Sequence, residues 1–199
     1  RSLCAQDYDL SRVEIVGANP HSPDGLSEEL KKIQMETALR GGPAFKEILV
    51  DGAHFRNRGY LIQRAFAASK EELVIGMDCD LVLPPDFLAR LAPVVSANPG
   101  RIVGVYRNFL KPGTTEKILG GEIDPIARFG ELLAEDGEEE QGYRGILGYC
   151  QALGREAWGK VGYPEEFDNI AQSDVAFVER LQRIGITPLF LKDLRVLHL

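Results

Sequence analysis

The sequence has 199 residues, of which 44% are hydrophobic and 27% are charged, and its formal net charge is −7. This length suits a single domain, and the acidic balance argues against a nucleic-acid-binding protein, which needs clustered Lys and Arg to contact phosphates. No apolar run approaches the ~18 residues of a membrane-spanning helix, and the first ten residues do not resemble a signal peptide.

Strand and helix patterns alternate in the first half of the chain. We expect strands at residues 12–19, 46–51, 72–77 and 101–106. The helices between them are expected from Ser27 to the Gly41-Gly42 pair, from 57 to 69, and from 86 to 97. The continuous apolar run at 72–77 is typical of a strand buried on both faces. This order predicts an α/β fold with a mostly parallel sheet between two layers of helices.

The pattern loosens after residue 109 and becomes regular again near the end. Residues 111–121 are rich in Gly and Thr, and the acidic run at 136–140 is typical of a solvated loop. We expect a strand at 145–153, a helix at 173–184, and two short strands at 187–191 and 195–199. No repeat or low-complexity linker divides the chain, so residues 1–199 are predicted to form one domain.

Two aspartates, Asp78 and Asp80, directly follow the apolar strand at 72–77. Ligands of open α/β sheets bind at the carboxyl ends of strands, so a site is expected here. Two carboxylates one residue apart can hold a hard cation such as Mg²⁺ or Mn²⁺, which bridges to substrate phosphates. The alternative is a solvated turn in which Asp80 or Asp86 caps the next helix.

Asp174 and His198 are two further candidates. Asp174 lies in the first turn of the helix at 173–184, where a carboxylate acts either as a simple cap or as a general base near the ligand edge. His198 lies in an apolar strand, where a lone histidine is usually a packed residue and becomes a ligand only beside a metal. His21 and His54 lie in turn-like segments with no supporting pattern.

Four segments together resemble one enzyme family. The stretch EELVIGMDCDLVLPPDF is similar to the D-x-D strand and turn of nucleotide-diphospho-sugar glycosyltransferases with the Rossmann-like GT-A fold. Among these enzymes, it resembles family 2 most. REAWGKVGYPEEF and SDVAFVERLQRIG resemble two later motifs of that family, and RSLCAQDYDLSRVEIV resembles the end of its first helix and its second strand. The four segments occur in the family's order and span nearly the whole chain.

The resemblance implies a metal-dependent transfer of a sugar from a nucleotide-diphospho-sugar to an acceptor hydroxyl, in glycan or polysaccharide assembly. It places Asp78, Asp80 and His198 at a divalent cation, Mn²⁺ or Mg²⁺, with Asp78 also against the nucleotide ribose. Asp174 would be the general base of an inverting reaction. The segment before the D-x-D strand would bind the nucleotide sugar through Arg56, Asn57 and Arg58.

Three features depart from the family pattern. Ser173 stands where an acid usually precedes the base, and residues 17–19 (GAN) stand where an acidic pair often holds the nucleotide base. The family's first strand and much of its first helix would precede Arg1. We therefore expect a catalytic domain over residues 1–199 that lacks this first strand.

Two other functions are left open by the same residues. A non-catalytic binding or scaffold module built on a glycosyltransferase-like fold would explain the departures. Residues 78–82 (DCDLV) also satisfy the D-x-D-x-[TV] pattern of haloacid-dehalogenase-type phosphatases, in which Asp78 would be the nucleophile. Lys192 and Asp193 would be a poor substitute for the later residues of that family.

The cysteines indicate the cellular setting. Cys4, Cys79 and Cys150 are odd in number, far apart and in no C-x-x-C pair, so a disulfide framework or a cysteine-based zinc site is not expected. A reducing, cytoplasmic location follows as the default. The expected partners are the sugar donor and a hydroxyl acceptor, with no nucleic acid, and with peripheral membrane association open to a longer parent protein.

Overall fold

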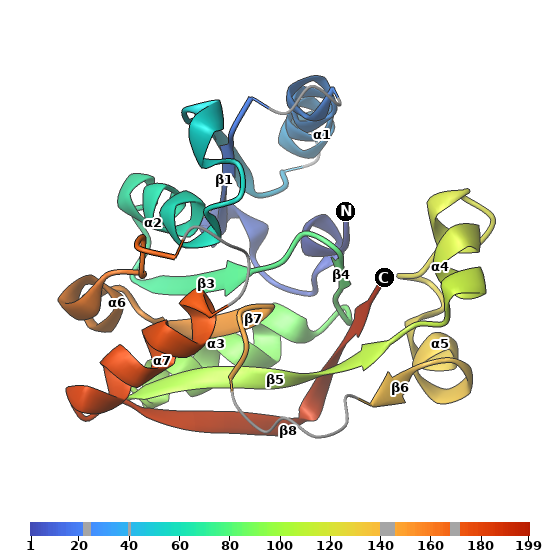
Figure 1. Ribbon diagram of the computed structural model, residues 1–199. Helices are drawn as coiled ribbons and strands as arrows, with labels where there is room; N and C mark the ends of the chain where they lie inside the picture. Colours follow the sequence, from blue (N-terminus) through green and yellow to red (C-terminus); the bar gives the residue numbers. More distant parts are fainter. Residues whose placement is uncertain (22–24, 40, 140–145, 168–171) are drawn as a thin grey trace.

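The computed structural model describes residues 1–21, 25–39, 41–139, 146–167 and 172–199, which form an α/β fold (Figure 1). In the described part of the chain, no helix has the length and apolar character needed to cross a membrane. The strands are β1 (Glu14–Asn19), β2 (Ala44–Leu49), β3 (Leu73–Met77), β4 (Leu81–Val82), β5 (Arg101–Phe109), β6 (Glu138–Glu139), β7 (Cys150–Gly154) and β8 (Thr187–His198). The helices are α1 (Leu26–Leu39), α2 (Arg58–Ala68), α3 (Phe87–Ala97), α4 (Pro112–Leu119), α5 (Phe129–Glu135), α6 (Arg155–Val161) and α7 (Ser173–Arg183).

The main sheet has the strand order β3-β7-β5-β8-β4, with β6 paired to the end of β5. β5 and β8 are parallel, but β7 is antiparallel to both β3 and β5, and β4 is antiparallel to β8. The α/β class is confirmed, whereas the prediction of a mostly parallel sheet is wrong. The alternating pattern of the first half does not include β7. This strand follows a long connection after β5 and lies between β3 and β5, antiparallel to both.

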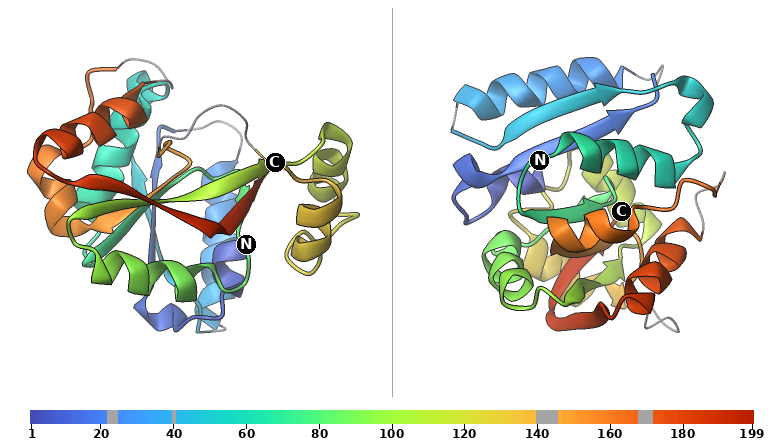
Figure 2. Two further views of the ribbon diagram at one scale, coloured as in Figure 1. Left: turned by 90° about the horizontal axis from the view of Figure 1, so that it is seen from below. Right: turned by 90° about the vertical axis from the view of Figure 1, so that its left-hand side faces the viewer.

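Helices cover both faces of this sheet (Figure 2). On one face α3 packs through Phe87 and Leu91 against Val105 of β5. On the other face Trp158 of α6 and Phe177 of α7 belong to a second core cluster, which also includes residues of α2. The predicted three layers are therefore present.

β1 and β2 form a separate two-stranded parallel sheet that contacts α1 and α2. Among the described residues, no strand pairs with the second edge of β1 or of β3. The segment just before β3 contacts the start of β1, where the backbone N–H of Lys70 donates to Glu14 Oε2 at 3.2 Å. β3 is thus an edge strand whose residues are half-buried, and the prediction of a strand buried on both faces is wrong.

The loose segment after β5 contains helices that the sequence pattern did not predict. Pro112 occupies the first turn of α4, where its missing N–H is not needed. α4 and α5 form a lobe beside the main sheet (Figure 1), and Phe129 and Leu132 of α5 pack with Leu197 of β8. Of the acidic run, residues 138–139 form β6 and residue 140 lies outside the described residues. The expected strand at 145–153 begins at 150, and residue 145 lies outside them too.

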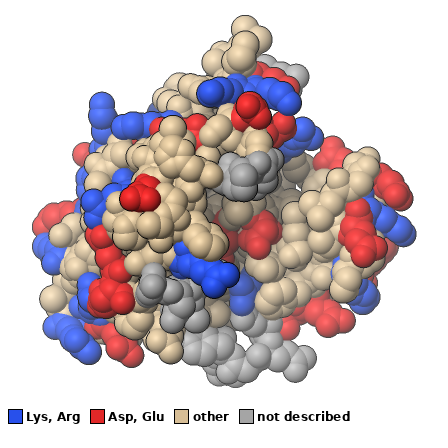
Figure 3. Space-filling model, turned by 45° about the horizontal axis from the view of Figure 1, so that its top comes forward, with Lys and Arg blue, Asp and Glu red and all other residues tan. Residues whose placement is uncertain are grey.

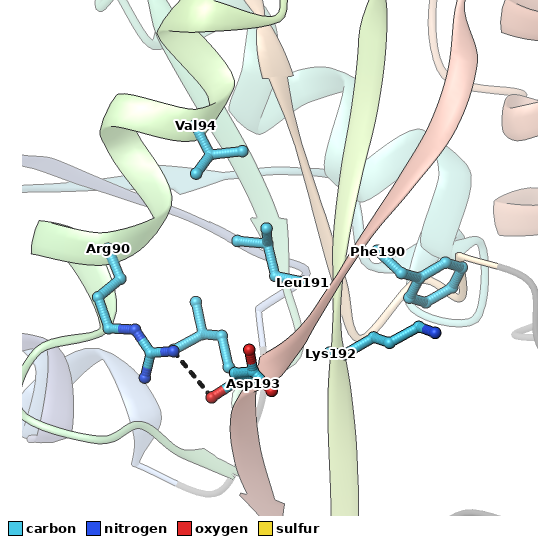
Figure 4. A pocket seen from close by; sticks show the side chains of 7 residues that line it. Arg90, Val94, Phe190, Leu191, Lys192 and Asp193 are labelled. Carbon is cyan, nitrogen blue, oxygen red and sulfur yellow. Dashed lines mark hydrogen bonds between the residues drawn. The ribbon is translucent and has the colours of Figure 1, made fainter.

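β8 is one long strand, not two short ones, and it carries a bulge. Val105 pairs with Leu191 whereas Tyr106 pairs with Arg195, so residues 192–194 are extra. The bulge and α3 enclose a hollow of about 420 Å³, in which Arg90 donates to the carbonyl oxygen of Asp193 at 2.9 Å (Figure 4). The hollow is lined by Arg90, Val94, Phe190, Leu191, Lys192, Asp193 and Leu194, without Asp78 or Asp80.

Candidate active site

Asp78 and Asp80 follow the last residue of β3 and are fixed by backbone hydrogen bonds. The N–H of Asp78 donates to the carbonyl oxygen of Tyr149 at 3.1 Å, which carries the pairing of β3 with β7 on to the first aspartate. The carbonyl oxygen of Asp80 accepts from the N–H of Leu199 at 3.0 Å. The two carboxylates remain partly open to solvent, with side-chain exposures of 31% and 49%.

His198 reaches the aspartates from the other end of the sequence. Leu81 of β4 pairs with His198 of β8, which places the imidazole Nε2 at 3.4 Å from Asp80 Oδ2. One donor atom each of Asp78, Asp80 and His198 lies within 4.8 Å of the others. Carboxylates suit Mg²⁺ and Mn²⁺, and an imidazole ligand favours a transition metal. The three side chains can therefore hold one divalent cation, and their chemistry fits Mn²⁺ well.

The helix-capping alternative for these aspartates does not match the structure. Asp86 is the N-cap residue of α3 but makes no side-chain capping hydrogen bond, and its carboxylate lies 3.6 Å from Arg90. Gln6 Oε1 instead accepts the N–H of Leu88 at 2.9 Å and satisfies that helix end. Asp80 has no part in this cap.

Arg58 lies behind Asp78. Its Nη2 is 2.5 Å from Asp78 Oδ1 and 2.6 Å from the carbonyl oxygen of Gly148, and its side chain is 17% exposed. Burial lowers the pKa of Arg58, but Tyr163, Asp78 and Asp174 nearby outweigh it and raise the pKa above its usual value. The guanidinium therefore stays charged beside the first aspartate.

Asp174 is held by two backbone N–H groups. Its Oδ1 accepts from Val175 at 2.8 Å in the first turn of α7, and its Oδ2 accepts from Gly148 at 2.9 Å. The carboxylate thus accepts one N–H of the first turn of α7, but it is not the helix cap, because the N-cap residue is Gln172. Each carboxylate oxygen has about two acceptor sites, so each keeps one for a proton. Accepting these two N–H groups is therefore compatible with accepting a proton.

The other two residues expected near a nucleotide sugar, Arg56 and Asn57, differ in their exposure to solvent. Asn57 is buried: its Oδ1 accepts from the N–H of Tyr60 at 2.9 Å to cap α2, and its Nδ2 donates to the carbonyl oxygen of Glu165 at 2.8 Å. Arg56 is exposed, with its guanidinium 5.2 Å from the ring centroid of Phe55. Of the three candidates in this segment, Arg56 has the side chain most open to a ligand.

Burial governs the acid–base state of the neighbouring tyrosine and thiols. It raises the pKa of Tyr163 well above its usual value, and this phenol donates to Gln151 Oε1 at 3.0 Å. Burial also raises the pKa of Cys150, to about 12, and burial together with Asp80 raises that of Cys79. Near pH 7 the phenol of Tyr163 and the thiols of Cys150 and Cys79 stay protonated, so none of these three groups is available as a base.

The face shown in Figure 3 is hollowed near its centre. Acidic side chains lie inside the hollow, and basic side chains lie at its lower edge. A cation-assisted site for a charged ligand needs such a mixture, because anionic groups bind the metal and cationic groups attract phosphate.

Gly148 is a site residue that sequence reasoning missed. It touches both Arg58 and Asp174, and a Cβ at this position would lie 1.9 Å from Arg58 Nη1. Gly148 lies in a turn, but its φ is not positive, so the backbone conformation does not require glycine there. A side chain at this position would displace the guanidinium of Arg58, which is 90 residues away in the sequence, and only the folded chain shows this contact.

The sequence matches the family model described as glycosyl transferase family 2 over residues 1–157. A comparison with curated proteins gives no match. Among solved structures, the mannosyltransferase PcManGT from Pyrobaculum calidifontis, in complex with GDP-Man and Mn²⁺, has a TM-score of 0.66 and 17% identity, covering 98% of this chain and 50% of that one. TarS 1–349 from S. aureus in complex with UDP has a TM-score of 0.68 and 15% identity, covering 98% and 54%.

A third similar structure is GalNAc-T7 with UDP, GalNAc and Mn²⁺, at a TM-score of 0.68 and 13% identity, covering 99% of this chain and 39% of that one. The chain thus spans about half the length, or less, of these glycosyltransferases. Identities this low show a shared fold, which is the GT-A fold expected from the motifs. The family match covers most of the residues, and the chain therefore belongs to glycosyl transferase family 2.

Proposed function

We propose that this chain carries the catalytic site of a metal-dependent glycosyltransferase, which moves a sugar from a nucleotide-diphospho-sugar to an acceptor hydroxyl with inversion. The observation that carries the proposal is the convergence of Asp78, Asp80 and His198, with Asp174 joined to them through Gly148 and Arg58. The mannosyltransferase and GalNAc-T7 structures, which hold nucleotides or a nucleotide sugar with Mn²⁺, support it.

The donor is bound at the aspartate end of this site. Asp80 and His198 would be the principal ligands of a divalent cation, and Asp78 would offer Oδ2, because its Oδ1 accepts from Arg58. A divalent cation held by these three side chains would stabilise the negative charge of the departing diphosphate. Arg56, which is exposed and lies two residues before α2, would attract the phosphates from outside.

Asp174 is the general base in this proposal. Its carboxylate accepts the proton of the acceptor hydroxyl while the hydroxyl oxygen forms a bond to the anomeric carbon of the sugar. The bond from that carbon to the diphosphate oxygen breaks, and the nucleoside diphosphate leaves with the electron pair. A single displacement of this kind inverts the anomeric configuration. Glycan or polysaccharide assembly is the proposed setting, by analogy with the family.

Calorimetry tests the donor half of the proposal. The protein is mixed with UDP, GDP or CMP, each with Mn²⁺, and each again with a chelator. We expect one nucleotide to bind in the presence of Mn²⁺ and to lose most of its affinity with the chelator. Binding of none of the three would favour the non-catalytic module, for which Asp78, Asp80 and His198 need hold no ligand.

We also propose that the described residues are a catalytic domain without the first strand of the family. The open edges of β1 and β3 support this, because one more strand between them would join the two sheets. The phosphatase alternative has no such support. Lys192 and Asp193 line the hollow between α3 and β8, not the site of Asp78.

A further inference from the structure

The guanidinium of Arg58 is held by acceptor groups of the protein itself. Its side chain is 17% exposed, and its Nη2 is taken by Asp78 Oδ1 and by the carbonyl oxygen of Gly148, at 2.5 and 2.6 Å. Two acceptors of the protein itself therefore hold this end of the guanidinium. A phosphate would have to displace a charged partner to reach it.

The backbone holds Arg58 in this position from both sides. Asn57 caps α2 and is itself tied to the carbonyl oxygen of Glu165 at 2.8 Å. Gly59 lies so close to Pro164 that a Cβ would be 1.7 Å from its carbonyl oxygen. These contacts fix the start of α2, and with it the backbone position of Arg58, the first residue of the helix.

Gly148 connects Arg58 to the proposed base. Its carbonyl oxygen accepts from Arg58, and its N–H donates to Asp174 Oδ2 at 2.9 Å. The missing side chain is part of this connection, because a Cβ would lie 1.9 Å from Arg58 Nη1. Asp78, Arg58, Gly148 and Asp174 thus form one continuous hydrogen-bonded chain across the site.

We propose that Arg58 is a positioning residue, which orients Asp78 toward the cation and, through Gly148, fixes Asp174 relative to it. The proposal rests on the proposed function, in which Asp78 and Asp174 act on donor and acceptor. It has a consequence for metal binding. The guanidinium of Arg58 donates to Asp78 Oδ1, and its positive charge offsets part of the negative charge of the cation site. Arg58 therefore fixes the geometry of the site but weakens its affinity for a cation.

The variant Arg58→Met removes the charge and the donors but keeps a long side chain in a mostly buried place. The binding of Mn²⁺ in the absence of nucleotide is measured from the electron paramagnetic resonance signal of the free ion. We expect Mn²⁺ to bind about tenfold more tightly than in the parent protein, because one neighbouring positive charge is gone. We expect kcat for transfer to fall about 100-fold and the donor KM to stay within about threefold.

Two control variants separate charge from geometry. Arg58→Lys keeps the charge but replaces the planar fork by a point donor, so Mn²⁺ affinity should stay near that of the parent while kcat is only partly restored. Arg64→Gln removes the same charge from the same helix, where Arg64 pairs with Glu165 at 2.6 Å and not with the site. This variant should leave Mn²⁺ affinity and kcat unchanged.

Each outcome decides for or against the role. Tighter Mn²⁺ binding with slower transfer supports it. Weaker or unchanged Mn²⁺ binding contradicts it and leaves Arg58 with a purely structural role, and a raised donor KM at unchanged kcat would make Arg58 a donor ligand instead. If the parent protein transfers no sugar, the proposed function fails, but the Mn²⁺ comparison still tests Arg58. If Arg58→Met does not fold, Gly148→Ala displaces the guanidinium, and an unchanged kcat there would refute the proposal.

Discussion

The carboxylate of Asp80 is the side chain on which the cation site depends most. It lies 3.4 Å from His198 Nε2 and is not committed to the cap of α3. Asp80→Ala should weaken Mn²⁺-dependent nucleotide binding by roughly 100-fold or more, since even outer-shell changes at metal sites cost 10- to 100-fold. Calorimetry with the preferred nucleotide measures this. Asp86→Ala, which removes a carboxylate six residues later beside Arg90, is the matched control and should bind normally.

Asp174 is predicted to act in transfer and not in donor binding. Asp174→Asn keeps an amide oxygen for the N–H of Gly148 but cannot take a proton near pH 7. Nucleotide affinity should therefore stay within about twofold, while the transfer rate falls by about 10²- to 10⁴-fold. Parallel calorimetry and product assays measure the two quantities. If nucleotide binding fell as far as it does in Asp80→Ala, the separation of roles between the two aspartates would be wrong.

At the scale of elements, the start of α2 fixes the position of Arg58. The position of this helix start depends in turn on Gly59. Gly59→Ala should lower the free energy of unfolding by about 2–3 kcal/mol, because the new Cβ would meet the carbonyl oxygen of Pro164 at 1.7 Å. Urea unfolding measures the change. A Cβ at Gly130, in α5, would meet no atom within 4 Å, so Gly130→Ala should stabilise the protein by up to about 1 kcal/mol. Equal effects of the two substitutions would contradict the close approach of α2 to residue 164.

Local patterns predicted the elements whose signals are local. The apolar spacing after Ser27 marks α1, and the run LVIGM marks β3, each within a few residues. Ser27 itself is not the cap that the sequence indicates, because α1 begins at Leu26 and the Ser27 hydroxyl donates to Glu47 Oε1. α4 was not predicted, because its apolar residues are few and its position depends on contacts with the rest of the lobe. The direction of β7 was not predicted either, because strand direction depends on long-range pairing. Gly148 was not predicted for the same reason, because its contact with Arg58 is long-range.

The predicted site residues illustrate the same division. The D-x-D pair could be found because it directly follows a strand, where sheets bind ligands. The resemblance to a family placed His198 with it, and the pairing of Leu81 with His198 supplies the physical reason. The assignment of Arg58 to the donor came from its sequence neighbours. Its contacts with Asp78 and Gly148 depend on the meeting of α2, β3 and the segment before β7, which no local pattern records.

At the scale of the whole molecule, β1 and β3 each have an edge without a described neighbour. In a longer form of the protein that contains the family's first strand, that strand should pair with these two edges. Hydrogen exchange should then slow by about tenfold or more at the amides of β3 that point away from β7, because they would gain partners and burial. The amides of β5, which is paired on both sides, serve as the internal control. Equal exchange at β3 in the long and short forms would refute the missing strand.

The central claim is that Asp78, Asp80 and His198 bind one divalent cation at the nucleotide site. A crystal structure of the protein with Mn²⁺ and the nucleotide that binds by calorimetry tests it most directly, because the anomalous signal of manganese locates the ion independently. We expect a single manganese peak with carboxylate oxygens of the aspartates and His198 Nε2 as ligands at about 2.0–2.4 Å, and with diphosphate oxygens on its open side. A nucleotide bound without manganese at these residues, or manganese bound elsewhere, would contradict the claim.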